Sequence, residues 1–160
     1  MKIGLVLNEL HRSENDLAHE LLQIADRHKV DHEIYHVARD LAAWSQRHVR
    51  ELARIAEQYG ESLNPEPEGE ARLAGKLLEK GAEMAGRLKA PGLLLLRDLR
   101  EIHMKVAGVS LDWEMLAQAA QGIKHAELLD VASRCHADTL RQLKWSNAKL
   151  KEESTQILVS

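Results

Sequence analysis

The chain has 160 residues, which is enough for one domain with a hydrophobic core of its own. Apolar residues make up 44% of the sequence but aromatic residues only 3%, so Leu and Ala must provide most of the buried surface, which favours helices over sheets. The net charge is −3, with 22 basic and 25 acidic residues interspersed, which argues against a nucleic-acid-binding or membrane-surface protein.

The cysteine content and the apolar runs favour a cytoplasmic protein. The single cysteine, Cys135, cannot form an internal disulfide, so a reduced setting is the simplest interpretation. The short apolar run at the N-terminus has no cleavage-site pattern, and the run 93–96 is far too short to span a bilayer. We therefore expect neither a signal peptide nor a membrane segment.

The first half of the chain predicts two helices. Apolar residues recur at alternating steps of four and three, which is the spacing of one helix face, over about 10–28 and again over 31–59. Ser13 is the expected N-cap of the first helix, and Gly60 is the expected C-cap of the second.

The break between these helices is weak, because Lys29-Val30-Asp31 contains neither Gly nor Pro. We interpret it as the turn of a hairpin in which Asp31 caps the second helix. A single helix of about 45 residues would be near 70 Å long, well beyond usual globular lengths. An elongated bundle of three long helices stays the alternative architecture.

The middle of the chain is the expected linker and crossover. Residues 60–69 are rich in Gly, Pro and Glu and predict a linker. A glycine-rich helical stretch over 70–89 follows, which we interpret as part of the long crossover of an up-down-down-up bundle. Its apolar residues could instead face another protein, in a helical interaction module; they are Leu73, Leu77, Leu78 and Met84.

Two more helices are predicted in the second half. The most regular apolar spacing of the chain predicts one helix over 92–121, ended by Gly122. A further helix is expected over 126–153, with Leu129, His136 and Leu140 on its apolar line. The whole chain is thus expected to be one all-α domain.

Two Ser-x-x-His tetrads occupy matching places in the two halves, at 45–48 and 133–136. Each His falls on the apolar line of a predicted helix. Four-helix di-iron bundles place Glu-x-x-His at such positions on two of their helices. This chain therefore has the two histidines but has Ser where those bundles have Glu.

Four polar residues interrupt the apolar lines and are the candidate metal ligands: Glu14, His48, His103 and His136. An unpaired polar group in a core costs a few kcal/mol, so four that meet could satisfy one another or bind a cation. One carboxylate and three imidazoles suit Fe, Mn or Zn. The alternative is that each His is a core or border residue hydrogen-bonded to a neighbour, with Glu14 or the Ser of each tetrad as the partner.

The segments 10–17 and 44–52 resemble the first hairpin of the bacterial ferritin-like stress-induced domain family. That family has an acidic ligand early in its first helix and a His-Val-x-x-Leu stretch late in its second. The resemblance implies a four-helix ferritin-like bundle, often oligomeric, with a carboxylate-bridged di-iron centre. Glu14 and His48 match its ligand positions.

The other ligand positions of that family do not match. Ala43, Trp44 and Ser45 occupy the neighbourhood of the second-helix glutamate, and the last-helix glutamates are missing near 134–136. Imidazoles cannot bridge two cations as carboxylates do. The resemblance therefore implies a degenerate di-iron site that holds at most a single metal and does not store iron.

The expected function is that of a non-catalytic or weakly metal-binding ferritin-like protein, related to stress or to a partner. Its expected cofactor is none or one transition metal, and its expected partner is a second copy or another protein. A mononuclear metalloprotein with redox or O₂ chemistry and a metal-free helical interaction module are the two alternatives.

Overall fold

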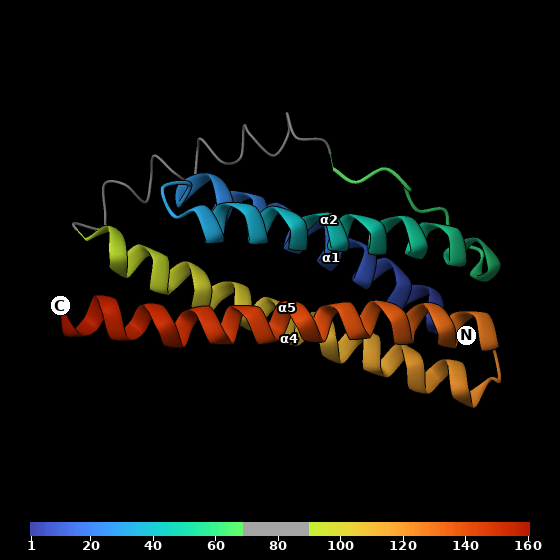
Figure 1. The fold of residues 1–160 in the computed structure, drawn as a ribbon. Helices are drawn as coiled ribbons and strands as arrows, with labels where there is room; N and C mark the ends of the chain where they lie inside the picture. Colours follow the sequence, from blue (N-terminus) through green and yellow to red (C-terminus); the bar gives the residue numbers. More distant parts are fainter. Residues whose placement is uncertain (69–89) are drawn as a thin grey trace.

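The computed structural model describes residues 1–68 and 90–160, which form four α-helices and one short 3-10 helix. The bounds are α1 (Ile3–Arg27), α2 (His32–Ala56), η1 (Glu57–Tyr59), α4 (Pro91–Gly122) and α5 (Ala126–Val159). Figure 1 shows the hairpin α1–α2 packed on the hairpin α4–α5. The predicted all-α four-helix bundle is confirmed, whereas the helix predicted over 70–89 and its apolar residues lie outside the described residues.

Neighbouring helices of the bundle run antiparallel. α1 packs on α2 and α4, and α5 packs on α4 and α2. Asn8, early in α1, bonds Glu61 just after α2 at 2.7 Å, while Arg27 at the end of α1 bonds Asp98 near the start of α4 at 2.7 Å. α2 therefore ends at the opposite end of the bundle from the start of α4, as the up-down-down-up order requires (Figure 1).

The turn between α1 and α2 depends on Asp31. Its side chain accepts a hydrogen bond from the backbone N–H of Ile34 at 3.1 Å, which makes it the N-cap of α2. Gly60 ends η1, which directly follows α2. Its φ of 76° is in the left-handed region that favours glycine. The hairpin is thus confirmed, and the alternative of three long helices is wrong.

Two helices are longer than the sequence predicted. α1 begins at Ile3, so Ser13 lies inside the helix and is not its N-cap. Ile3 and Leu7 are buried and continue the same helix face. Asn8 does not break the helix, because its side chain donates to the Gly4 carbonyl at 2.9 Å. At the other end of the chain, α5 continues to Val159.

The core is built mainly from Leu and Ile around one Trp. Its largest fully buried side chains are Trp113, Leu7, Leu10, Leu17, Leu21, Ile34, Leu52, Ile55, Leu99, Ile102, Leu116 and Leu128. Within residues 1–68 and 90–160, no helix combines the length and apolarity that a bilayer crossing requires.

α5 buries a different line of residues from the predicted one. Thr139 is fully buried, whereas Leu140 is 47% exposed, so the line is shifted by one position. Beyond Cys135 the buried face of α5 is polar, and it consists of Thr139, Gln142, Ser146, Lys149 and Glu153. The apolar periodicity predicted the wrong buried face of α5 because polar side chains of this helix point into the bundle.

Candidate functional site

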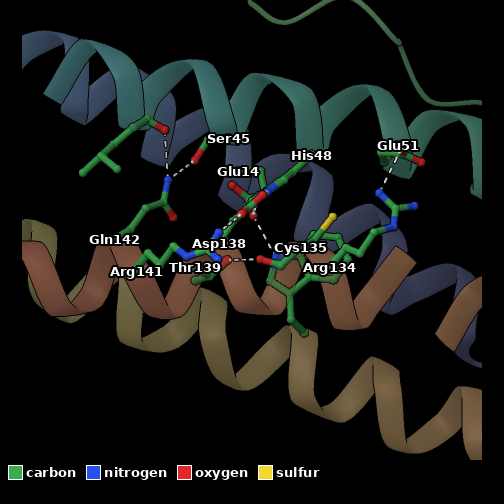
Figure 2. A network of polar contacts seen from close by, with 12 residues as sticks. Glu14, Ser45, His48, Glu51, Arg134, Cys135, Asp138, Thr139, Arg141 and Gln142 are labelled. Carbon is green, nitrogen blue, oxygen red and sulfur yellow. Dashed lines mark hydrogen bonds and ion pairs between the residues drawn. The ribbon is translucent and has the colours of Figure 1, made fainter. Parts of the chain in front are cut away.

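Four side chains, one from each helix, meet inside the bundle: Glu14, His48, Trp113 and Asp138. We call them the Glu14 cluster. Oε1 of Glu14 lies 2.8 Å from Nδ1 of His48 and accepts a hydrogen bond from Nε1 of Trp113, also at 2.8 Å. Nε2 of His48 lies 3.1 Å from Oδ2 of Asp138 (Figure 2). The cluster is a continuous chain from a buried carboxylate through an imidazole to a second carboxylate.

Regular helix spacing aims these side chains inward. Glu14 stands on the α1 face that carries Leu10 and Leu17, and both of these leucines are fully buried. His48 stands on the buried face of α2, and its ring packs against that of Trp113 in an edge-on arrangement with 5.8 Å between the centroids. Each polar group therefore takes a position that would otherwise hold a core residue.

The two carboxylates favour the charged form of His48. Burial opposes that charge, but the hydrogen bonds and charges of Glu14 and Asp138 outweigh it and hold the pKa of His48 above its ordinary value. A neutral imidazole donates only one hydrogen bond, whereas the protonated ring donates two. Protonated His48 therefore satisfies both carboxylates.

The cluster is closed to substrates. Glu14 is fully buried and His48 is 2% exposed. Oε2 of Glu14 has no hydrogen-bond partner among the described residues. Asp138 is the outer end of the chain, and its Oδ1 accepts a hydrogen bond from Arg141 at 3.2 Å. The arrangement can hold a proton and stabilise charge, but it offers a substrate no access to the imidazole.

The structure does not bring the other two candidate ligands to this cluster. Nδ1 of His103 lies 2.8 Å from the hydroxyl of Ser146, and Nε2 of His136 lies 3.0 Å from that of Ser110. Both pairs join α4 to α5. Both rings are partly buried, so these contacts agree with hydrogen-bonded histidines at the border of the core, although the partners are not the serines of the two tetrads.

These contacts determine how the possible metal-ligating side chains are arranged. Within the part of the chain that the structure describes, no three His, Cys, Asp or Glu side chains are grouped so that they could hold a metal ion. In the Glu14 cluster the reason is that Glu14 and Asp138 contact opposite nitrogens of the ring. The two carboxylates therefore do not converge on a common point.

Two members of the cluster were missed by the sequence analysis. Trp113 is not among the four candidate ligands, yet its indole N–H is a donor to Glu14. Asp138 does not lie on the predicted apolar line of α5, which runs through His136. Asp138 precedes Thr139, which lies one turn after Cys135, and it is the burial of these two residues in the structure that places Asp138 beside the core.

Part of the buried polar face of α5 is paired with α2. Nε2 of Gln142 donates to the Leu41 carbonyl and to the Ser45 hydroxyl, both at 3.0 Å (Figure 2). Nζ of Lys149 lies 2.9 Å from Glu33 and 3.3 Å from Glu152. This seam between α2 and α5 is held by hydrogen bonds and ion pairs where most of the bundle is apolar.

The outer side of α4 carries a second set of apolar residues. Met104, Leu111 and Met115 are 58%, 60% and 56% exposed, and their spacing of seven and four residues places them on one helix face. Gly108 stands within the same row. We call these four residues the outer face of α4; it lies opposite the buried residues of the same helix, such as Val109.

Compared with models of known protein families, with curated proteins and with solved structures, the chain matches none of them.

Proposed function

We propose that the protein acts by binding and not by catalysis, and that it docks an amphipathic helix of another polypeptide chain on the outer face of α4. The observation that carries this proposal is the exposure of Met104, Leu111 and Met115, each more than half accessible to water. Single exposed apolar residues are common, but a row of large ones on one helix is typical of an interaction site.

The shape of this face favours a helix as the partner. The row runs along a single helix with the seven-and-four spacing of a helix–helix contact. A Cβ atom added at Gly108 would meet nothing within 4 Å, so no contact among the described residues requires a glycine there. Glycine costs about 1 kcal/mol of stability in a helix interior. It would, however, let a second backbone approach closely.

The Glu14 cluster supports a structural role beside this surface. Its carboxylate, imidazole and indole join α1, α2 and α4, and Asp138 adds α5. Because Glu14 and His48 are closed to substrates, their chemistry serves the fold and keeps α4 in place. The outer face of α4, in contrast, is open to a partner.

Photo-crosslinking tests this proposal. A photoreactive amino acid replaces Leu111 in the full chain produced in cells, and the matched control carries it at Asp16, an exposed residue of α1. We expect higher-mass adducts from position 111 and none from position 16, and mass spectrometry should locate the crosslinked peptide in an amphipathic helical segment. The proposal fails if position 111 gives no more adduct than position 16.

A second candidate function is a single-metal site in a ferritin-like bundle, and one observation favours it. Glu14 and His48, the two residues that match the ferritin-like pattern, are in contact across the α1–α2 hairpin. A carboxylate that holds Nδ1 of a histidine leaves Nε2 for a cation, and Asp138 lies on that side of the ring. His48 and Asp138 would then supply two of the ligands of an Fe, Mn or Zn ion.

Metal analysis tests the second candidate. Iron, manganese and zinc are quantified in the purified protein and in His48→Ala. A stoichiometric metal that is lost in the variant supports the candidate. A protein that holds none of the three metals at any occupancy excludes it.

A further inference from the structure

Given the helix docking proposed above, on which this step rests, we infer that the docked helix is α4 of a second copy of the chain. The two α4 helices would pair antiparallel about a two-fold axis that passes beside Gly108. Closed two-fold dimers are the commonest symmetric assemblies of proteins. In such a dimer one surface must be complementary to itself, and the outer face of α4 has that property in two respects.

The first respect is the order of the apolar residues. Met104 and Leu111 lie at nearly equal distances on either side of a point between residues 107 and 108. A two-fold axis at this point sets Met104 of one subunit level with Leu111 of the partner subunit. Gly108 then stands where the two helices are closest, and where any side chain would meet its own symmetry mate.

The second respect is charge. Arg100 and Glu114 are both exposed, and neither is in a hydrogen bond or an ion pair with a residue of the described ranges 1–68 and 90–160. They are about four turns apart on α4, so they stand on the same flank of the apolar row. The axis brings Arg100 opposite Glu114 of the partner subunit, and symmetry repeats the pair.

On the opposite flank, two charges are already used inside one subunit. Glu101 accepts a hydrogen bond from Arg97, which is in line with the row, at 3.0 Å, and Lys105 bonds Glu20 of α1 at 2.6 Å. Asp112, also on that flank, is partly buried and is in no hydrogen bond or ion pair with a residue of 1–68 or 90–160. Among the described residues, the pair of exposed opposite charges that a second copy would neutralise is therefore that of Arg100 and Glu114. An unrelated helix, or residues 69–89 of the same chain, would not need these charges to be arranged symmetrically.

Charge reversal in the purified full chain tests the dimer. Sedimentation equilibrium should give a dimer for the native sequence. Arg100→Glu and Glu114→Arg should each raise its dissociation constant about tenfold, because each creates two like-charge contacts. The double variant Arg100→Glu/Glu114→Arg should return close to the native value. Arg47→Glu, an equal charge change on exposed α2, is the control and should have no effect.

A variant at the axis adds a measurement that misfolding cannot imitate. Gly108→Leu should weaken the dimer at least tenfold, since its side chain separates the two helices. The thermal midpoint of the monomer should not fall, because space is open around this position and leucine is the better helix former. A monomeric native protein, or a double charge variant in which the two losses add, would overturn the dimer.

The crosslinking experiment separates this inference from the proposed function. Adducts of twice the chain mass, with hybrid peptides in a mixture of ¹⁴N and ¹⁵N protein, support the second copy. Adducts with a helix of a different protein overturn the second copy and leave helix docking in place. Adducts with residues 69–89 of the same chain, or none at all, overturn both.

Discussion

His48 lies between two carboxylates, and this position makes the stability of the fold depend on pH. Its pKa is raised in the folded protein above the ordinary value of 6.5, so folding favours the protonated ring. The stabilisation is therefore complete below about pH 6.5 and is lost as the pH rises through the raised value. The residue thus adds to stability on the acidic side of its titration.

Replacement of His48 measures this contribution. The free energy of unfolding in urea is compared between the native chain and His48→Gln at a series of pH values. We expect the variant to be less stable below pH 6.5 and the difference to shrink as the pH rises above it, because the native ring then loses its charge. Parallel pH profiles for the two proteins would contradict this account of His48.

Trp113 contributes to the fold as a hydrogen-bond donor as well as a core residue. Trp113→Phe keeps an aromatic ring but removes the N–H that Glu14 accepts, so a fully buried carboxylate loses a partner. We expect a loss of about 2–3 kcal/mol in the free energy of unfolding, measured by urea denaturation. Trp145→Phe is the control, since the buried Nε1 of Trp145 has no hydrogen-bond partner among the described residues.

The comparison of these two variants separates the loss of the hydrogen bond from the loss of ring volume. If Trp145→Phe is as harmful as Trp113→Phe, then the loss reflects the volume of the indole ring and not the hydrogen bond. We expect Trp145→Phe to lose less stability than Trp113→Phe, because only Trp113 has a hydrogen bond to Glu14 to lose.

At the scale of helices, Asp31 and Ser13 differ in whether they cap a helix. Asp31→Ala should cost about 1 kcal/mol of stability, because it removes the side chain that caps α2. Ser13→Ala should have an effect near zero, since Ser13 lies within α1 and has no cap to provide. Chemical denaturation measures the free energy of unfolding of both variants. Equal losses in the two variants would contradict a specific capping role of Asp31.

These helix ends also show which parts of the fold could be predicted from the sequence. The hairpin turn and Gly60 were predictable because Asp and Gly act on the backbone next to them. The start of α1 was not, because Ser13 looks like a cap in any sequence, and only the burial of Ile3 and Leu7 shows that the helix began earlier. Local chemistry names candidate caps, but tertiary packing decides between them.

The candidate site was predictable to the same extent. Glu14 and His48 could be paired from their similar distances to one turn, and they are in contact. His103 and His136 could not be placed, because their partners come from the rotation of α5, which a periodic pattern does not define when the buried residues are polar. The ring of His103 contacts the hydroxyl of Ser146, and that of His136 contacts the hydroxyl of Ser110, away from Glu14 and His48.

At the scale of the whole molecule, the two hairpins are joined by polar contacts at places far apart along the bundle. The Glu14 cluster joins them in the interior. Near the end where α1 stops, Asp98 of α4 accepts from Arg27 at 2.7 and 2.8 Å and lies 2.7 Å from Nε2 of His28. Asp98 is 5% exposed, so solvent screens this second contact only weakly.

Loss of Asp98 should therefore loosen the packing of one hairpin on the other. Asp98→Ala leaves Arg27, which is 18% exposed, without a counter-charge in a largely dry place. We expect a loss of about 3 kcal/mol in the free energy of unfolding, whereas Asp130→Ala, which breaks an exposed pair within α5, should change it by less than about 0.5 kcal/mol. Hydrogen exchange should then be faster along the facing turns of α1 and α4, and equal losses in the two variants would mean that this contact does not hold the hairpins together.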